Sequence, residues 1–97
     1  MAKLLDDFEK QFPEIWGAYT QLKTACDRGG PLDRKTSELI RIGISVAMEH
    51  EGGLIAHISQ ARKAGASEEE IQHAIVLATG LAGLPPTLKA FGAAKKA

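Results

Sequence analysis

Three side chains suited to acid–base chemistry, Glu38, His50 and His57, follow one another in the middle of the chain. Eleven residues separate Glu38 from His50, and six more separate His50 from His57. Imidazole changes its charge near neutral pH, so a histidine with a carboxylate partner can give or take a proton there. On one straight helix Glu38 and His50 would lie roughly 18 Å apart. Contact between Glu38 and His57 therefore requires tertiary packing or a second subunit.

These residues also have ordinary structural interpretations. His57 stands beside Leu54, Ile58 and Ala61, where a histidine can simply edge an apolar stripe. Glu38 falls in the early turns of a predicted helix, where a carboxylate complements the positive end of the helix dipole. The spacing alone does not separate the catalytic interpretation from the structural one.

The segment from Glu38 to Phe91 reads ELIRIGISVAMEHEGGLIAHISQARKAGASEEEIQHAIVLATGLAGLPPTLKAF. It resembles the core of the carboxymuconolactone decarboxylase / AhpD-like family, and the resemblance covers about residues 32–91. Members of that family with thiol chemistry carry the pattern E-x11-C-x2-C-x3-H, and the same spacing here gives Glu38, His50, Gly53 and His57. The resemblance implies an all-α, AhpD-like bundle, which we expect to contain five to six helices.

The missing cysteines decide which chemistry of the family is expected. A peroxidase of the thiol type needs one thiolate to attack and a second thiol to resolve the sulfenic acid, and His50 and Gly53 supply neither. Peroxiredoxin activity, although typical of the family, is therefore not expected. The decarboxylase branch is the better match. It implies a cofactor-free lyase or proton-transfer enzyme for a small carboxylated, lactone-like acid, with His57 and Glu38 as catalytic residues.

A different class of function stays open. The chain can equally be an oligomer of the same fold that has lost its thiol chemistry and binds a small molecule or partner without catalysis. The catalytic hypothesis needs a cavity that holds both His57 and Glu38, whereas the binding hypothesis does not.

Two further site predictions concern the diglycine. Gly52 and Gly53 permit close backbone approach, and free N–H groups at a helix start there could hold a carboxylate, so His50, Gly52 and Gly53 are predicted to bind substrate. Two histidines with Glu38 or Glu51 could also ligate a metal ion. Since H-x6-H broken by glycines is not a recognised metal motif, we predict no metal site.

Composition limits the class of protein. The chain has 97 residues, with 12 basic and 12 acidic side chains, which predicts one domain over residues 1–97 and no nucleic-acid partner. Its one cysteine, Cys26, excludes an internal disulfide and is expected to be a small buried residue. No signal peptide or membrane span is evident, so we expect a cytoplasmic protein. The short chain, its many small residues and the resemblance together favour a homo-oligomer, a trimer or hexamer.

Residues that typically start or end helices recur along the whole chain. A first helix is predicted over residues 2–11, and Pro13 begins a second that ends at Gly29-Gly30. Asp33 is the predicted N-cap of a third helix, and the diglycine is expected to break the chain before a fourth, over residues 54–64. The inward stripe of the second helix is expected to be Ile15, Trp16, Tyr19, Leu22 and Cys26.

The last third of the chain carries the sharpest local signals. Gly65 is predicted to end the fourth helix in the left-handed conformation, and Ser67 with Glu70 forms a capping box for the fifth. Gly83 closes that helix, and Pro85-Pro86 opens a last one that ends near Lys95. The inward positions of the fifth helix are expected to be Ile71, Ala74, Ile75, Ala78 and Leu81.

Overall fold

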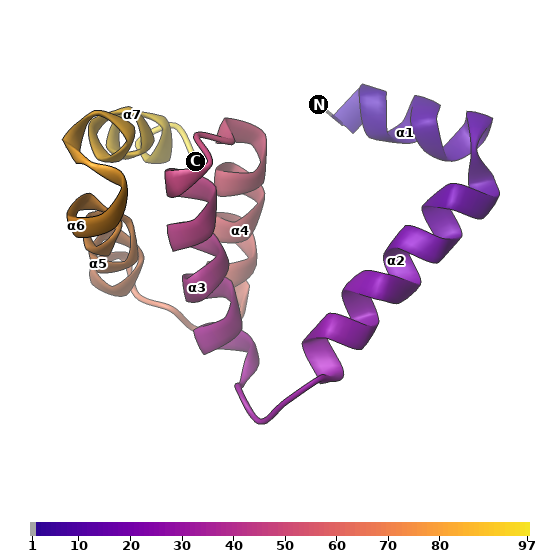
Figure 1. Ribbon diagram of the computed structural model, residues 1–97, viewed down its shortest axis with the longest axis horizontal. Coiled ribbons are helices and arrows are strands. Elements are labelled where there is room, and N and C mark those ends of the chain that lie inside the picture. The colour runs from indigo at the N-terminus through magenta and orange to yellow at the C-terminus, as the bar shows by residue number, and fades with distance from the viewer. Residues whose placement is uncertain (1) are drawn as a thin grey trace. The chain divides into compact units, whose positions relative to one another are not determined.

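The computed structural model describes residues 2–97, and these form helices joined by short turns, without a strand (Figure 1). The prediction of an all-α protein is confirmed. The chain divides into two compact units, Met1–Pro31 and Leu32–Ala97, so the boundary falls where the resemblance to the family core begins. The single domain over residues 1–97 stays a prediction. Within residues 2–97, no helix is long and apolar enough to cross a membrane.

The first unit is a pair of helices, α1 (Ala2–Gln11) and α2 (Pro13–Arg28), and Pro13 occupies the start of α2 as predicted. Neighbouring aromatic rings contact one another along it, with ring centroids of Phe8 and Phe12 5.3 Å apart and of Trp16 and Tyr19 5.7 Å apart. No residue of α2 is buried. Two short helices have too little surface to enclose an apolar stripe, which is why local contacts leave this one uncovered.

The stripe predicted to face inward on α2 therefore needs correction. Within the helix pair, its large members Ile15, Tyr19 and Leu22 are exposed, and Trp16 is half-buried. Cys26 is exposed as well, contrary to the expectation of a buried cysteine. Helical periodicity identified the apolar face correctly, but periodicity contains no information about what covers that face.

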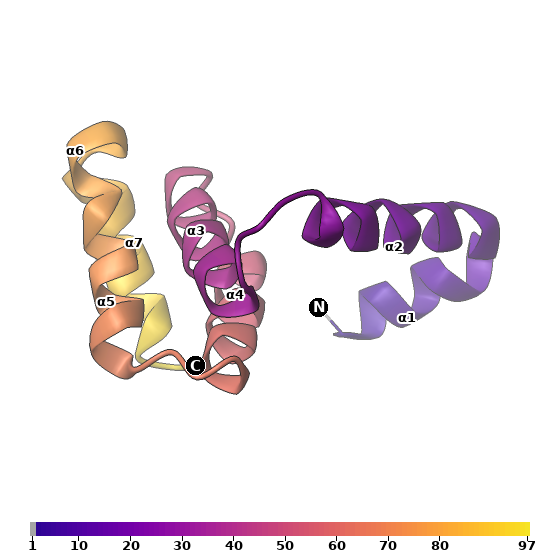
Figure 2. The ribbon, with the colours of Figure 1, turned by 90° about the horizontal axis from the view of Figure 1, so that it is seen from below.

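The second unit is built around α3 (Arg34–Ala47) and α4 (Glu51–Lys63), which lie side by side (Figures 1 and 2). Asp33 caps α3 as predicted, because its Oδ1 accepts a hydrogen bond of 2.8 Å from the backbone N–H of Thr36. The inner faces of the two helices supply the centre of the core, where the fully or almost fully buried side chains are Ile42, Val46, Leu54 and Ile58.

The joint between α3 and α4 differs from the prediction. The chain turns at Glu49, which has φ 53°, and not at the diglycine. The N–H of Glu49 donates to the carbonyl of Val46 and the N–H of His50 to that of Ser45, each at 3.0 Å, which is the Schellman pattern of a helix end. The helix α4 then starts at Glu51, so Gly52 and Gly53 belong to its first turn and do not break the chain.

The rest of the second unit is formed by α5 (Glu68–Leu77), the short α6 (Thr79–Ala82) and α7 (Leu84–Ala94). Figure 2 shows α5 and α7 running alongside each other. Two predictions, a helix end and a helix start, are confirmed in this part of the chain. Gly65 has φ 97° at the end of α4, and Ser67 and Glu70 form both hydrogen bonds of the capping box.

The predicted fifth helix is interrupted. It was expected to run to Gly83 with Leu81 inward, but α5 ends at Leu77 and Leu81 is 97% exposed. At the break the N–H of Ala78 bonds to the carbonyl of Ile75, three residues back, which tightens the last turn. The side-chain hydroxyls of Thr79 and Thr87 then join α6 to α7 at 2.9 Å. This hydrogen bond holds α6 against the start of α7, an arrangement that a continuous fifth helix would not allow.

The left-handed conformation of Glu49 generates a test of stability. A side chain with a Cβ costs about 1 kcal/mol in this conformation, and glycine avoids the cost. We expect Glu49→Gly to exceed Glu49→Ala in free energy of unfolding by about 1 kcal/mol, measured by urea denaturation at one protein concentration. Both variants remove the weak 3.9 Å pairing of Glu49 with Lys89, so this loss cancels. Equal stability of the two variants would contradict the assigned strain.

Candidate functional site

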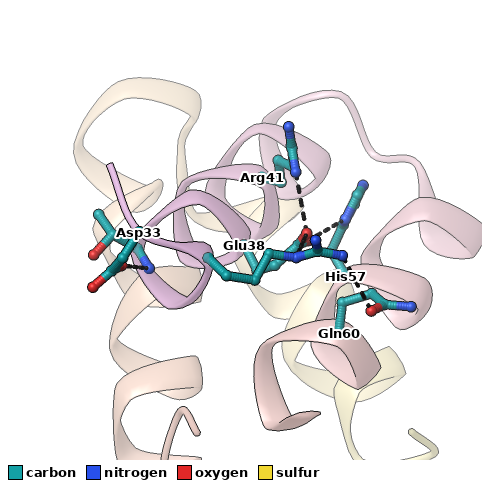
Figure 3. A network of polar contacts seen from close by, with 7 residues as sticks. Asp33, Glu38, Arg41, His57 and Gln60 are labelled. Carbon is teal, nitrogen blue, oxygen red and sulfur yellow. Dashed lines mark hydrogen bonds and ion pairs between the residues drawn. The ribbon is translucent and has the colours of Figure 1, made fainter. Parts of the chain in front are cut away.

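Glu38 is the buried carboxylate of the second unit, with only 2% of its side chain exposed. It lies on α3 one turn before the core residue Ile42, on the face that packs against α4. Its Oε1 atom lies 2.7 Å from His57 Nδ1, and its Oε2 atom lies 3.2 Å from Arg34 Nε and 3.1 Å from Arg41 Nη1. Figure 3 shows the carboxylate between Arg41 and His57.

The structure brings together the two predicted catalytic residues. His57 follows Glu38 by nineteen positions in sequence, and the packing of α3 against α4 within one subunit is sufficient for their contact. An ionised carboxylate only accepts hydrogen bonds, so the proton of this contact belongs to His57 Nδ1. The other ring nitrogen, Nε2, points away from the carboxylate (Figure 3). Because the His57 side chain is 30% exposed, this nitrogen is the one available to a ligand.

Two arginines complete the arrangement, and sequence reasoning missed both. Arg34 precedes Glu38 by four residues and Arg41 follows it by three, the spacings at which side chains meet on one helix face. That pattern was available in the sequence and could have identified them. A charged group taken out of water requires partners of opposite charge, which is why the burial of Glu38 depends on these guanidinium groups.

His50, Gly52 and Gly53, predicted to bind substrate, lie at the first turn of α4. His50 is exposed and is the N-cap residue, and its ring lies over Gly53, where an added Cβ would fall 2.5 Å from His50 Nδ1. The first turn also contains the carboxylate of Glu51, which disfavours an anion there. His57 follows His50 by seven positions, which is roughly 10 Å along the helix. The structure therefore does not bring His50 into the contact between Glu38 and His57.

Among residues 2–97, no three His, Cys, Asp or Glu side chains are grouped in a way that could hold a metal ion. His50 and His57 lie too far apart along α4 to ligate one metal ion together. The candidate site around Glu38 and His57 therefore consists of acid–base and hydrogen-bonding groups on α3 and α4.

Charged groups outside the site cap α3 and α5. The N–H of Ser67 and the ammonium of Lys35, 2.9 Å away, both lower the pKa of Glu70, with the backbone hydrogen bond contributing more. Hydrogen bonds from Thr36 likewise lower the pKa of Asp33 at the start of α3. A carboxylate whose pKa falls on folding stabilises the fold above its unfolded pKa, and this contribution is lost as the pH drops through the folded pKa. These caps fix α3 and α5 from outside the site.

A sequence model of the Carboxymuconolactone decarboxylase family matches residues 13–96 of this chain. The chain is also similar to the crystal structure of apo-lpg0406, a carboxymuconolactone decarboxylase family protein from Legionella pneumophila. The TM-score is 0.86 at 28% sequence identity, over 98% of this chain and 88% of that chain. An uncharacterized protein of Haemophilus influenzae is 41% identical over 59 residues, which are 61% of this chain and 52% of that protein. The chain thus spans about half the length of this relative.

The contact between Glu38 and His57 predicts the tautomer of the ring. When His57 is neutral we expect its proton on Nδ1, whereas free imidazole side chains favour Nε2, because the carboxylate accepts only from Nδ1. Nitrogen-15 NMR of the ring distinguishes the two forms. In Glu38→Ala the His57 signals should change toward the ordinary tautomer, while the exposed His73 serves as an internal reference. An Nε2-protonated His57 in the native protein would refute the assigned geometry.

Proposed function

The chain belongs to the carboxymuconolactone decarboxylase family, and from this premise we propose a cofactor-free lyase or proton-transfer enzyme that acts on a small carboxylated, lactone-like acid. The observation that carries the proposal is the 2.7 Å contact between Glu38 Oε1 and His57 Nδ1, made by a buried carboxylate and a partly exposed imidazole. Such a pair fixes the ring and stabilises its protonated form, and it leaves Nε2 to exchange a proton with a ligand.

In the proposed reaction Glu38 and His57 supply the proton transfer, and a neighbouring subunit completes the cavity that the substrate also needs. The bond between the carboxylate carbon and the substrate breaks, CO2 leaves, and its electron pair enters the conjugated carbonyl system as an enolate. Protonated His57 then delivers the proton on Nε2 to the substrate carbon and becomes neutral, and water restores that proton. Glu38 stabilises the imidazolium form before transfer and holds the ring in line during it.

A second candidate function rests on a different observation. A groove of about 560 Å³ runs between α3 and the α5–α6 segment, with a mainly apolar lining. Its lining includes Leu39, Ile44 and Leu77 but neither Glu38 nor His57. This groove favours a protein that binds an apolar molecule or partner surface without catalysis, as the loss of the thiol pair also allows.

We further propose that the chain works as a homo-oligomer, a trimer or hexamer. The support is the amount of apolar surface that one subunit leaves in water, including Leu22 at 59% and Leu77 at 64% exposure. Exposed apolar area on this scale is typical of association surfaces. His50, Gly52 and Gly53 stay predicted ligand contacts within this proposal, since a neighbouring subunit could complete a pocket at the start of α4.

Turnover of a carboxylated lactone tests the catalytic proposal. We expect His57→Ala to lower kcat by about 10²- to 10⁴-fold, the usual contribution of a general acid or base. Glu38→Gln should lose less, because its amide oxygen still accepts from Nδ1. Lys63→Ala, in the exposed last turn of α4, is the control and should retain wild-type activity. Circular dichroism must show all three variants folded, and full activity in folded His57→Ala would refute the role of the histidine.

Light scattering tests the assembly. A mass of three or six times the 10.4 kDa subunit is expected at micromolar concentration. A constant 10.4 kDa species across the whole concentration range would overturn the proposal.

A further inference from the structure

The groove between α3 and the α5–α6 segment is bordered by large apolar side chains on both of its sides. Ile40 and Ile44 form the rim on α3, and Leu77 and Leu81 form the rim on the α5–α6 segment. Within the second unit their exposed fractions range from 47% for Ile40 to 97% for Leu81. A molecule lying only inside the groove would leave Leu81 in water, so a complete cover must extend beyond this rim.

The floor of the groove is formed by small residues. An added Cβ on Gly43 would lie 3.7 Å from the backbone carbonyl oxygen of Ala74, so α3 and α5 approach each other closely there. Ala47 and Ala78 are further small residues of the lining. Small residues between two large rims leave room for a row of side chains from another helix, which is the usual geometry of helix packing. The groove therefore suits a helical protein surface.

The charge in the groove is already compensated within the second unit. Among the lining residues, the ionisable side chains are Glu70 and His73. The carboxylate of Glu70 lies 2.9 Å from the ammonium of Lys35 and accepts a hydrogen bond from the N–H of Ser67. An apolar surface that covers the groove would therefore not strip the water from an unpaired carboxylate. Two identical faces can meet here without strong repulsion between their carboxylates.

We propose that a second copy of the chain covers this groove with the same face, across a two-fold axis. The face carries both halves of such a contact, because Leu77 and Leu81 protrude whereas Gly43 and Ala47 leave room on α3. A two-fold rotation sets the protruding rim of each copy over the small residues of the other, and each contact then occurs twice. This inference rests on the proposed homo-oligomer and names the surface that forms it.

The apolar area of the face is large enough for a stable contact. The four exposed rim side chains present on the order of 500 Å², near the upper end of the range for the largest apolar patch of an ordinary monomer. Two such faces together bury on the order of 1,000 Å², which is about the lower bound for a specific interface. A small ligand would cover much less of this area and would leave both rims exposed.

A two-fold contact decides between the two assemblies proposed for the chain. A closed trimer has only a three-fold axis, whereas a hexamer of two stacked trimers has two-fold axes as well. A trimer alone would leave the groove face of every subunit in water. We therefore expect a hexamer, in which the groove faces join one trimer to the other.

Leu81→Glu tests the contact without disturbing the fold of the subunit, since the Leu81 side chain is almost fully exposed. The partner would bury each new carboxylate without a cation, so we expect the dissociation constant of the two-fold contact to rise about 100-fold or more. Light scattering should give six times the 10.4 kDa subunit mass for the wild type and three times for the variant. Ile44→Glu, on the opposite rim, should act in the same way.

Leu88→Glu is the matched control, because it places the same charge on a leucine of α7 that is 59% exposed and lies outside the groove. An even number of subunits should persist in this variant. Nile red, an uncharged dye that brightens on exposed apolar surface, gives a second readout. Leu81→Glu should bind more of it than the wild type at equal subunit concentration, because separation of the two copies uncovers the groove. Circular dichroism checks that every variant is folded.

Three results would overturn the inference: a wild type of three subunits, a six-subunit mass in both rim variants, or equal binding of Nile red by the wild type and Leu81→Glu. The last result would assign the groove to a small apolar molecule. A wild type of three subunits would leave the proposed homo-oligomer standing, whereas a 10.4 kDa wild type at every concentration would refute the homo-oligomer itself.

Discussion

The arrangement of α3 and α4 around the site depends on the carboxylate of Glu38, because a buried charge dictates what must surround it. Removing a carboxylate from water costs several kcal/mol unless charged partners and hydrogen bonds replace the lost hydration. Here both oxygens have such partners, since Oε1 meets His57 and Oε2 meets two arginines. The helix packing that buries Glu38 is therefore the same packing that selects the nitrogen of His57 available for chemistry.

Local chemistry was enough to predict most helix ends. Asp33, Gly65 and the Ser67–Glu70 box act through hydrogen bonds within a few residues, so their signals are complete in the sequence. The predicted break at the diglycine was wrong, because a glycine pair alone does not determine where a helix ends. Glycine permits a break but does not require one, and the hydrogen bonds that end α3 instead place Glu49 in the left-handed region. Just after the break at Ala78, Thr79 likewise bonds to Thr87, a partner eight positions away.

The site was predictable only in part. The resemblance to the family pattern made Glu38 and His57 candidates, but they stand nineteen positions apart on different helices, and only packing brings them within 2.7 Å. The two arginines lie within one turn of Glu38 and were recognisable from helix geometry once its burial was known. Burial is a tertiary property, however, and the sequence presents Glu38 simply as one of 12 acidic residues. The exposed stripe of α2 shows the same limit, since periodicity does not name the covering surface.

The two positions where thiol-dependent relatives carry cysteines are coupled through space in this chain. The ring of His50 occupies the volume that a side chain at position 53 would need, because an added Cβ would fall 2.5 Å from its Nδ1. Glycine at 53 and histidine at 50 are thus mutually compatible, whereas restoring a cysteine at 53 alone would force the ring aside. The contact between Glu38 and His57 involves neither position, so it persists without the sulfur atoms. An acid–base pair whose geometry does not depend on positions 50 and 53 needs no thiol for proton transfer, and this independence supports the lyase proposal.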